Sequence, residues 1–353
     1  MENEEETKEI KYIDLFGGVG GFRLGIERAT NLPKTSRSKQ RGNEKDSSNS
    51  EQVALASKQF TCVFYNDFDK YAVQIYNKNF NESYEATDIR TVKADSIPDF
   101  DMLCGGFPCQ AFSIAGKRKG FEDTRGTLFF EIARIIKAKK PKIVFLENVK
   151  GLLNHDKGQT FSVIIQTLSE LGYDVQWMVL NSKFFGVPQN RERVFIIGSL
   201  REEHKSEILP FRFSSSEFGQ NNECNEKTAV YFGDSIPKAK TRRGRVMDIS
   251  GANMAVPRGG VAVLDDYNHR IKSDNIVGAV RQTFNNPHEG NGCKIIEGMK
   301  IRRFTPIECE RLQGFPDNWT EGISESQRYK QMGNAVTVNV IEAIVRRLKN
   351  NDK

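Results

Sequence analysis

One cysteine stands where a reactive thiol is expected. Cys109 lies in the stretch 105–113, GGFPCQAFS, directly after a short apolar run that predicts a buried strand. Gly105 and Gly106 are expected to break that strand, and Pro108 fixes a backbone dihedral angle beside the sulfur. Enzymes with α/β folds place their chemistry at the carboxyl ends of parallel strands. The cysteine is therefore a candidate nucleophile, although a lone cysteine is more often an ordinary buried residue.

Three charged residues follow or precede other predicted strands. A strand at 142–146 ends in Glu147, and the segment leading into a strand at 193–197 carries Arg191 and Arg193. One residue separates the two arginines, so on an extended segment both side chains can point the same way. The sequence thus predicts a thiol, a carboxylate and two guanidinium groups at one edge of a sheet.

A glycine-rich turn follows the first predicted strand, 12–16. It contains Gly17, Gly18 and Gly20, and a helix with apolar periodicity begins directly after it. Such a turn lets a ligand approach backbone amide groups, but it is a purely structural tight turn about as often. The dinucleotide pattern G-x-G-x-x-G fails because Arg23 occupies the third glycine position. An NAD-dependent oxidoreductase is therefore disfavoured.

Two acidic residues are expected beside this turn. The second predicted strand, 61–65, delivers Asp67 and Phe68 at its carboxyl end, where an acid can accept hydrogen bonds from a ribose and a ring can stack on a base. Asp88 follows a helix predicted at 70–80. Either acid can instead be a helix cap or a solvated charge, and the aromatic ring can be a packing residue. In the order of the chain, the strand at 193–197 is predicted to be the seventh strand of the sheet.

Basic residues gather in two stretches that suit phosphate groups. The loop 113–126 interleaves them with glycines, as a lid over a phosphate-bearing substrate would. The run 237–245 contains five basic residues and no acid. A solvated surface is the alternative for both, and phosphate contact is favoured. The basic residues are Lys117, Arg118, Lys119 and Arg125 in the loop, and Lys238, Lys240, Arg242, Arg243 and Arg245 in the run.

Composition sets outer limits on the function. The 353 residues suffice for one large α/β domain and a smaller one, and a formal net charge of +6 fits a polyanionic partner without requiring one. No apolar run reaches the length of a membrane span, and the acidic stretch 1–10 is neither a signal peptide nor a transit peptide. A cytoplasmic location with six reduced cysteines is expected, and the lack of C-x-x-C spacing argues against zinc.

Six motifs in one order resemble the cytosine-5 DNA methyltransferase family of bacterial restriction-modification systems. They are DLFGGVGGF at 14–22, GGFPCQAFS at 105–113, ENV at 147–149, QNRERVF at 189–195, RRFTPIECERLQGFP at 302–316 and GNAV at 333–336. The resemblance covers most of residues 11–200 and 301–348. The part that matches weakly, 201–300, is the region that reads the DNA target in this family.

The resemblance implies an α/β fold with a Rossmann-like S-adenosylmethionine-dependent methyltransferase sheet and a second, smaller, loop-rich target-recognition domain. Residues 1–200 and 323–353 would form the catalytic domain, with 31–59 as a flexible insertion, and residues 201–322 the target-recognition domain. The last helix would then pack back onto the first part of the chain. A short helix predicted at 306–313 would bury Cys309 in the core.

The resemblance also implies the reaction, which is transfer of a methyl group from S-adenosylmethionine to carbon 5 of a cytosine in a specific duplex DNA sequence. Cys109 would add to carbon 6 of the flipped cytosine, and Glu147 would bind its amino edge and ring nitrogen. Arg193 would hold the base carbonyl, with Arg191 contributing to the same environment. The base that removes the carbon 5 proton is not identified.

Residue by residue, the motifs assign a cofactor site and DNA contacts. The turn at 16–20 would wrap the methionine half of the cofactor, Asp67 the ribose, Phe68 and Ile89 the faces of the adenine, and Asp88 its amino group. Two residues at the start of the C-terminal helix would close the site. The cofactor-binding set is Phe16, Gly17, Gly18, Gly20, Asp67, Phe68, Asp88, Ile89, Pro108, Asn334 and Ala335. DNA contacts are expected from Gln110, Ser113, Thr283 and the basic stretches.

Two other functions stay open at the level of sequence. One is the tRNA-methylating branch of the family, although the long recognition domain and the lack of its Cys-Phe-Thr signature argue against it. The other is a DNA-binding regulator without catalysis, which would have no need of Cys109, Glu147 and Arg193 together. The expected partner is duplex DNA with a target cytosine. A cognate restriction endonuclease would be encoded nearby without binding, and the chain would be a monomer.

Overall fold

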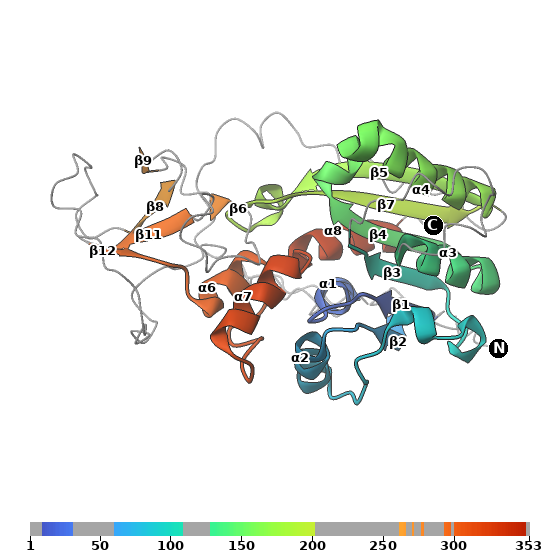
Figure 1. Cartoon of the computed structure of the whole chain (residues 1–353), viewed down its shortest axis with the longest axis horizontal. Coiled ribbons are helices and arrows are strands. Elements are labelled where there is room, and N and C mark those ends of the chain that lie inside the picture. Colours follow the sequence, from blue (N-terminus) through green and yellow to red (C-terminus); the bar gives the residue numbers. More distant parts are fainter. Residues whose placement is uncertain are drawn as a thin grey trace, which may run out of the picture.

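The computed structural model describes residues 9–30, 60–108, 128–201 and 303–348 in full, and the backbone of short strands between 261 and 302 and of residues 349–350. The main sheet consists of β1 (Ile10–Leu15), β2 (Phe60–Asn66), β3 (Met102–Gly106), β4 (Ile143–Val149), β5 (Tyr173–Asn181) and β7 (Glu192–Leu200). Their order is β2-β1-β3-β4-β7-β5 (Figure 1). The fold class is as expected.

Strand direction decides which residues meet. Strands β1 to β4 are parallel, whereas β7 is antiparallel to both β4 and β5. The carboxyl ends of β1 to β4 and the amino end of β7 therefore lie at one edge of the sheet. The prediction of seven strands is wrong for the described residues. The described residues between β2 and β3 contain no further strand, and residues 86–88 lead into a 3-10 turn, η1 (Ile89–Thr91).

Helices cover both faces of the sheet because successive strand residues point to opposite sides. On one face, α1 (Gly21–Thr30) and α8 (Val338–Asn350) pack over Tyr12, Cys104 and Phe145. On the other face, α3 (Leu128–Lys139) and α4 (Gln159–Glu170) pack over Leu15 and Leu146. Both layers are visible in Figure 1.

The last helix packs onto the first one, as expected. A Cβ atom added to Gly25 of α1 would lie 2.6 Å from the Cβ of Ile341 of α8, so only glycine permits this approach. A third apolar cluster joins α2 (Lys70–Phe80) to α6 (Pro306–Leu312) and α7 (Glu325–Asn334). Thr305 begins α6 with a capping box, and Cys309 is fully buried within it, as predicted.

A smaller antiparallel sheet lies at the left of Figure 1. Its strands are β8 (Val261–Asp265), β9 (Arg270–Ile271), β11 (Cys293–Glu297) and β12 (Lys300–Arg302), in the order β12-β11-β8-β9. Two further short strands, β6 (Gln189–Asn190) and β10 (Val277–Gly278), form a separate parallel pair. The remaining short helices are η2 (Ala94–Ser96), η5 (Lys150–Gly158) and η6 (Ser182–Phe185). Within the described residues, no helix combines the length and apolarity that a membrane crossing requires.

Candidate active site and cofactor turn

A carboxylate and a guanidinium group form an ion pair at the edge where the parallel strands end. Glu147 of β4 pairs in register with Gly106 of β3, and two residues later Val149 pairs with Arg193 of β7. The Arg193 Nε atom lies 3.0 Å from the Glu147 Oε1 atom, with side chains 16% and 11% exposed. A Cβ atom on Gly106 would lie 3.4 Å from the carboxylate, so the glycine leaves room for it.

Burial changes the protonation of Glu147. Desolvation raises the pKa of this carboxyl above its ordinary value, while the charges of Arg193 and Arg191 oppose the rise. The neutral acid is therefore easier to form here than on a protein surface. A neutral carboxyl can donate a hydrogen bond to a ring nitrogen, which a carboxylate cannot do.

The second arginine contacts a different part of the chain. Arg191 is almost fully buried, and its Nη2 atom donates to the carbonyl oxygens of Gly333 at 3.0 Å and Ala335 at 2.8 Å. Burial and the charge of Arg193 lower the pKa of its guanidinium, and the charge of Glu147 raises it. Arg191 thus bonds the 333–335 segment, and its guanidinium lies close enough to the ion pair for both charges to affect its pKa. Its direct role in catalysis stays a prediction.

The backbone that leads to the predicted nucleophile is held in place. Asn148, next to Glu147, donates from its Nδ2 atom to the carbonyl oxygen of Phe107 at 2.8 Å, in a buried position. Pro108 follows and is exposed. The expected break at Gly105 and Gly106 is wrong, because β3 continues through both. Parallel pairing with β1 and β4 at Gly105, and with β4 at Gly106, extends the strand despite the absence of side chains.

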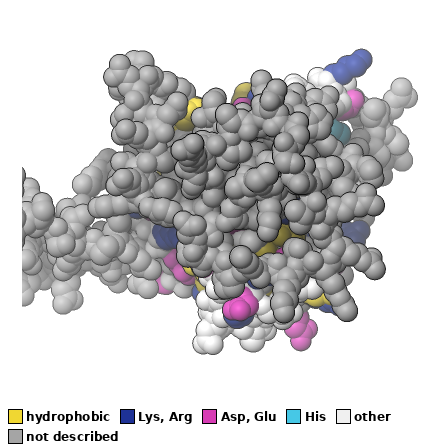
Figure 2. All heavy atoms as spheres, turned by 90° about the vertical axis from the view of Figure 1, so that its left-hand side faces the viewer, with side chains coloured by type: hydrophobic (Ala, Val, Ile, Leu, Met, Phe, Trp, Pro, Cys, Tyr) yellow, Lys and Arg dark blue, Asp and Glu magenta, His cyan; other side chains and the backbone are white. Residues whose placement is uncertain are grey.

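Several predicted residues lie outside the described part of the chain. Cys109 is the first of them, and the predicted DNA contacts are the others. They are Gln110, Ser113, Lys117, Arg118, Lys119, Arg125, Lys238, Lys240, Arg242, Arg243, Arg245 and Thr283. Figure 2 views the end of the molecule with the smaller sheet, where described basic and acidic side chains are visible next to each other.

The glycine turn has an unusual backbone conformation. Phe16, Gly18 and Gly20 have φ angles of 54°, 55° and 89°, in the left-handed region that glycine tolerates best. At Gly18 an added Cβ atom would meet no atom of the described residues within 4 Å. At Gly20 the same atom would lie 2.2 Å from the ring of Phe80. The turn is open on one side and packed on the other.

Asp67 ties the second strand to this turn. Its Oδ2 atom accepts from the Gly18 amide at 2.9 Å, and its Oδ1 atom accepts from the Asp69 amide at 2.8 Å. Burial raises the pKa of Asp67, and these two amide donors oppose the rise. The helix cap that competed with a ligand role belongs to Asp69, which begins α2. Phe68 is 70% exposed, so it is no packing residue.

Two of the remaining cofactor candidates have structural contacts of their own. Asp88 caps η1 through the Arg90 amide and also pairs with the Arg90 side chain, whose hydrogen bonds lower the pKa of Asp88. Ile89 is buried in the core beneath α3. The position predicted for Asn334 and Ala335 is wrong, since they end α7, whereas α8 begins at Val338.

Sequence reasoning missed Asp14. It is fully buried in β1, and neither carboxylate oxygen has a hydrogen-bond partner among the described residues. Burial raises the pKa of Asp14 to about 8, although the charge of Arg23 opposes this. A Cβ atom on Gly17 would lie 2.6 Å from its Oδ2 atom, so the carboxyl sits directly against the glycine turn. A lone acid inside an apolar strand was the signal in the sequence.

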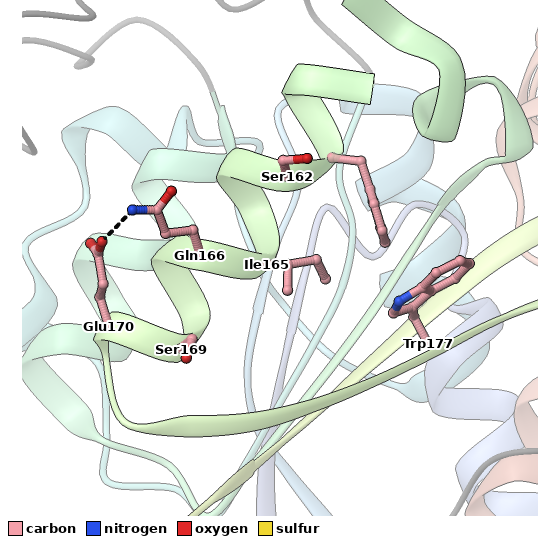
Figure 3. A pocket seen from close by; sticks show the side chains of 7 residues that line it. Ser162, Ile165, Gln166, Ser169, Glu170 and Trp177 are labelled. Carbon is pink, nitrogen blue, oxygen red and sulfur yellow. Dashed lines mark hydrogen bonds between the residues drawn. The ribbon is translucent and has the colours of Figure 1, made fainter. Parts of the chain in front are cut away.

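A separate surface groove lies between α4 and β5, the edge strand (Figure 3). The rings of Phe161 and Trp177 meet edge to face there, with centroids 5.0 Å apart, and Trp177 is 48% exposed. The groove contains none of the predicted site residues. It is lined by Phe161, Ser162, Ile165, Gln166, Ser169, Glu170 and Trp177.

Known proteins resemble the whole chain. A family model described as C-5 cytosine-specific DNA methylase matches residues 10–350. The Type II methyltransferase M.HhaI of Haemophilus parahaemolyticus is 36% identical over 346 residues, which cover 97% of this chain and 94% of that protein. The Type II methyltransferase M.HpaII of Haemophilus parainfluenzae is 38% identical over 375 residues, covering 97% and 89%.

A solved structure supports the fold independently. A putative DNA modification methyltransferase encoded within an E. coli prophage aligns with a TM-score of 0.60 and covers 97% of this chain and 99% of its own. The two sequences are 21% identical in this alignment, so the match is evidence of a shared fold.

Proposed function

The chain belongs to the C-5 cytosine-specific DNA methylase family and is a DNA cytosine-5 methyltransferase, and we propose that it uses S-adenosylmethionine as methyl donor and Cys109 as nucleophile. The observation that carries this proposal is the buried pair of Glu147 and Arg193, with its 3.0 Å contact at the edge where β3 leads toward Cys109. An acid that can be neutral and a fixed cation are what a cytosine ring needs while it gains negative charge.

The reaction begins with addition to the ring, because carbon 5 of cytosine is a weak nucleophile on its own. The Cys109 thiolate forms a bond to carbon 6, and the electron pair of the 5,6 double bond becomes available at carbon 5. Glu147 donates to the ring nitrogen and Arg193 to the carbonyl oxygen. After methyl transfer a base removes the carbon 5 proton, the double bond re-forms and the thiolate leaves.

The residues around the glycine turn fit S-adenosylmethionine, which supplies an electrophilic methyl group when bound. Open space at Gly18 admits a ligand against the backbone, and the unpartnered carboxyl of Asp14 lies against the same turn. Its negative charge would complement the positive charges of the cofactor. We propose that Asp67 accepts hydrogen bonds from the ribose and that the exposed ring of Phe68 stacks on the adenine.

Duplex DNA with a target cytosine is the proposed substrate, and both faces of the base must be reached, so the base is flipped out. We propose residues 201–322 as the target-recognition domain and a monomer as the working form. The relatives are named Type II methyltransferases. The proposed biological role is therefore the modification half of a restriction-modification system, acting without physical contact to the endonuclease.

Methyl transfer from tritiated S-adenosylmethionine tests the proposal. Labelling of duplex DNA is expected for the wild type and is expected to vanish in Cys109→Ser and to fall at least about 100-fold in Glu147→Gln. DNA containing 5-fluorocytosine should trap a covalent complex in the wild type alone, because the fluorine cannot leave as a proton does. Labelling that persists in Cys109→Ser would refute the nucleophile. Labelling of tRNA in place of DNA would refute the substrate.

A further inference from the structure

We propose that Trp319 is a positioning residue for cofactor binding: its indole N–H fixes the Val19–Gly20 peptide of the glycine turn and so sets the affinity for S-adenosylmethionine. The inference rests on the proposed function in one respect, the identity of the ligand. Trp319 itself lies outside the six sequence motifs and none of the predicted sites includes it.

The contact is direct and buried. The Nε1 atom of Trp319 donates to the carbonyl oxygen of Val19 at 2.9 Å. On the other side of the same peptide, the Gly20 amide donates to the carbonyl oxygen of Gly17 at 2.9 Å. The Val19–Gly20 peptide is therefore held at both its oxygen and its nitrogen, and rotating it would break both hydrogen bonds.

The turn needs such an anchor because its backbone is intrinsically free. Gly17, Gly18 and Gly20 have no side chains to restrict φ and ψ, and glycine loses more conformational freedom on folding than any other residue. A buried carbonyl that loses its donor is destabilised, so without the indole we expect the Val19–Gly20 peptide to rotate more often. Rotation would change the shape of the cradle that the ligand meets.

Trp319 is itself held firmly enough to act as an anchor. It is 9% exposed, and the Asn79 Nδ2 atom donates to its carbonyl oxygen at 3.0 Å. Its ring packs against those of Phe80 and Phe315, each with centroids 5.5 Å away. Phe80 is also the ring that blocks any side chain at Gly20. The anchor and the floor of the turn thus form one packed unit.

The test removes the N–H and keeps an aromatic ring. In Trp319→Phe we expect faster amide hydrogen exchange in residues 16–21 of the ligand-free protein. The dissociation constant for S-adenosylmethionine, from titration calorimetry, should rise about 5- to 20-fold, the equivalent of about 1–2 kcal/mol. The KM for S-adenosylmethionine should rise in parallel, while kcat and the KM for DNA stay within about twofold, because none of the proposed DNA contacts lies in this turn.

Two control variants separate positioning from general destabilisation. Trp177→Phe makes the same chemical change in the α4–β5 groove, and Tyr173→Phe removes another buried donor, the hydroxyl that bonds the Pro141 carbonyl at 2.6 Å. Both should leave the dissociation constant unchanged. Loss of folded protein lowers the number of active sites but leaves the affinity of the remaining ones intact. If Trp319→Phe folds poorly, replacement by isosteric β-(3-benzothienyl)alanine keeps the ring volume and removes the N–H.

The outcomes are distinguishable. The inference is overturned if Trp319→Phe matches Tyr173→Phe in exchange at 16–21, or if exchange accelerates and the affinity stays at the wild-type value. A wild type that binds no S-adenosylmethionine would refute the proposed function. The exchange measurement would still decide whether Trp319 orders the turn, since it is made without ligand.

Discussion

The ion pair of Glu147 and Arg193 and the glycine turn at 16–20 differ in how complete they are without ligands. At the edge, Glu147 already has a partner in Arg193, 3.0 Å away. At the turn, Asp14 is just as buried and has no hydrogen-bond partner among the described residues. A preformed ion pair can orient a reacting group, whereas an unpartnered buried acid favours the binding of a cation. The two regions should therefore respond differently to mutation and to pH.

The largest effect is expected from breaking the ion pair at the edge. Arg193→Met should lower kcat by about 10²–10³-fold, the usual loss when a fixed donor to developing charge is removed. Arg201→Met is the matched control, since it breaks an exposed Arg–Asp pair at the other end of β7, with Asp174 at 2.8 Å. Steady-state kinetics should show the loss in Arg193→Met alone. Equal losses in both variants would mean that general stability, and not the site, is affected.

Asp14 should make the stability of the ligand-free protein depend on pH. Its folded-state pKa of about 8 exceeds the ordinary value of 3.8, so between these values the folded state holds a proton that the unfolded state lacks. Stability from this group is thus present at low pH and is lost as the pH rises, by at most about 1.4 kcal/mol per pH unit. Urea unfolding between pH 5 and 8 should show this slope reduced in Asp14→Asn.

Asp14→Asn also tests whether the Asp14 carboxyl contacts the ligand. A cationic ligand favours ionised Asp14, so wild-type affinity for S-adenosylmethionine should rise from pH 6 to 8, and Asp14→Asn should bind more weakly with a flatter profile. Asp174→Asn, an exposed acid, is the control. Identical pH profiles in all three proteins would show that the carboxyl does not meet the ligand.

Phe68 provides a further test at the glycine turn, because its exposed ring contributes little to the stability of the fold. Phe68→Ala should weaken S-adenosylmethionine binding by about tenfold, since stacking on a base is worth about 1–3 kcal/mol, with Tm unchanged. Phe184→Ala removes a ring that is also partly exposed and should leave affinity alone. A fall in Tm without a change in affinity would make Phe68 a structural residue.

The smallest effect is expected at the ion pair that links Lys330 of α7 to Asp69, the N-cap of α2. The Lys330 Nζ atom lies 2.7 Å from Asp69, and the lysine side chain is 42% exposed. Burial alone would raise the pKa of Asp69, but hydrogen bonds from Lys330 and the Tyr71 amide leave it lower than usual. Lys330→Met should weaken cofactor binding by about two- to threefold at low salt, and less at 1 M salt. A salt-independent loss would indicate a different cause.

Much of the fold could be predicted from the sequence because the chain repeats one local unit, a strand, a turn and a helix. Apolar runs of four to seven residues, glycine turns and helices with 3.6-residue periodicity predict the strands and helices of the main sheet. The motif at 147–149 and the two arginines also predicted that Glu147 and Arg193 lie at the same edge of the sheet. The break at Gly105 and Gly106 was wrong because propensity is local, whereas pairing with Leu15 and Leu146 across Gly105 is not.

Contacts between distant segments could not be predicted in the same way. The link from Trp319 to Val19 spans 300 positions and depends on a backbone carbonyl, which has no signature in the sequence. The division of labour between Arg191 and Arg193 depends on where residues 333–335 lie. Spacing predicts that two side chains share a face, but only the packed chain decides what each one touches.

The close packing of Gly25 against Ile341 has a consequence for synthesis. Among the described residues, α1 and α8 are the long helices that cover the face of the sheet that holds Tyr12 and Phe145, and residues 338–348 are synthesised after every strand of that sheet. Until α8 has been synthesised, part of this apolar surface is exposed in the nascent protein. The exposed surface can aggregate or bind chaperones.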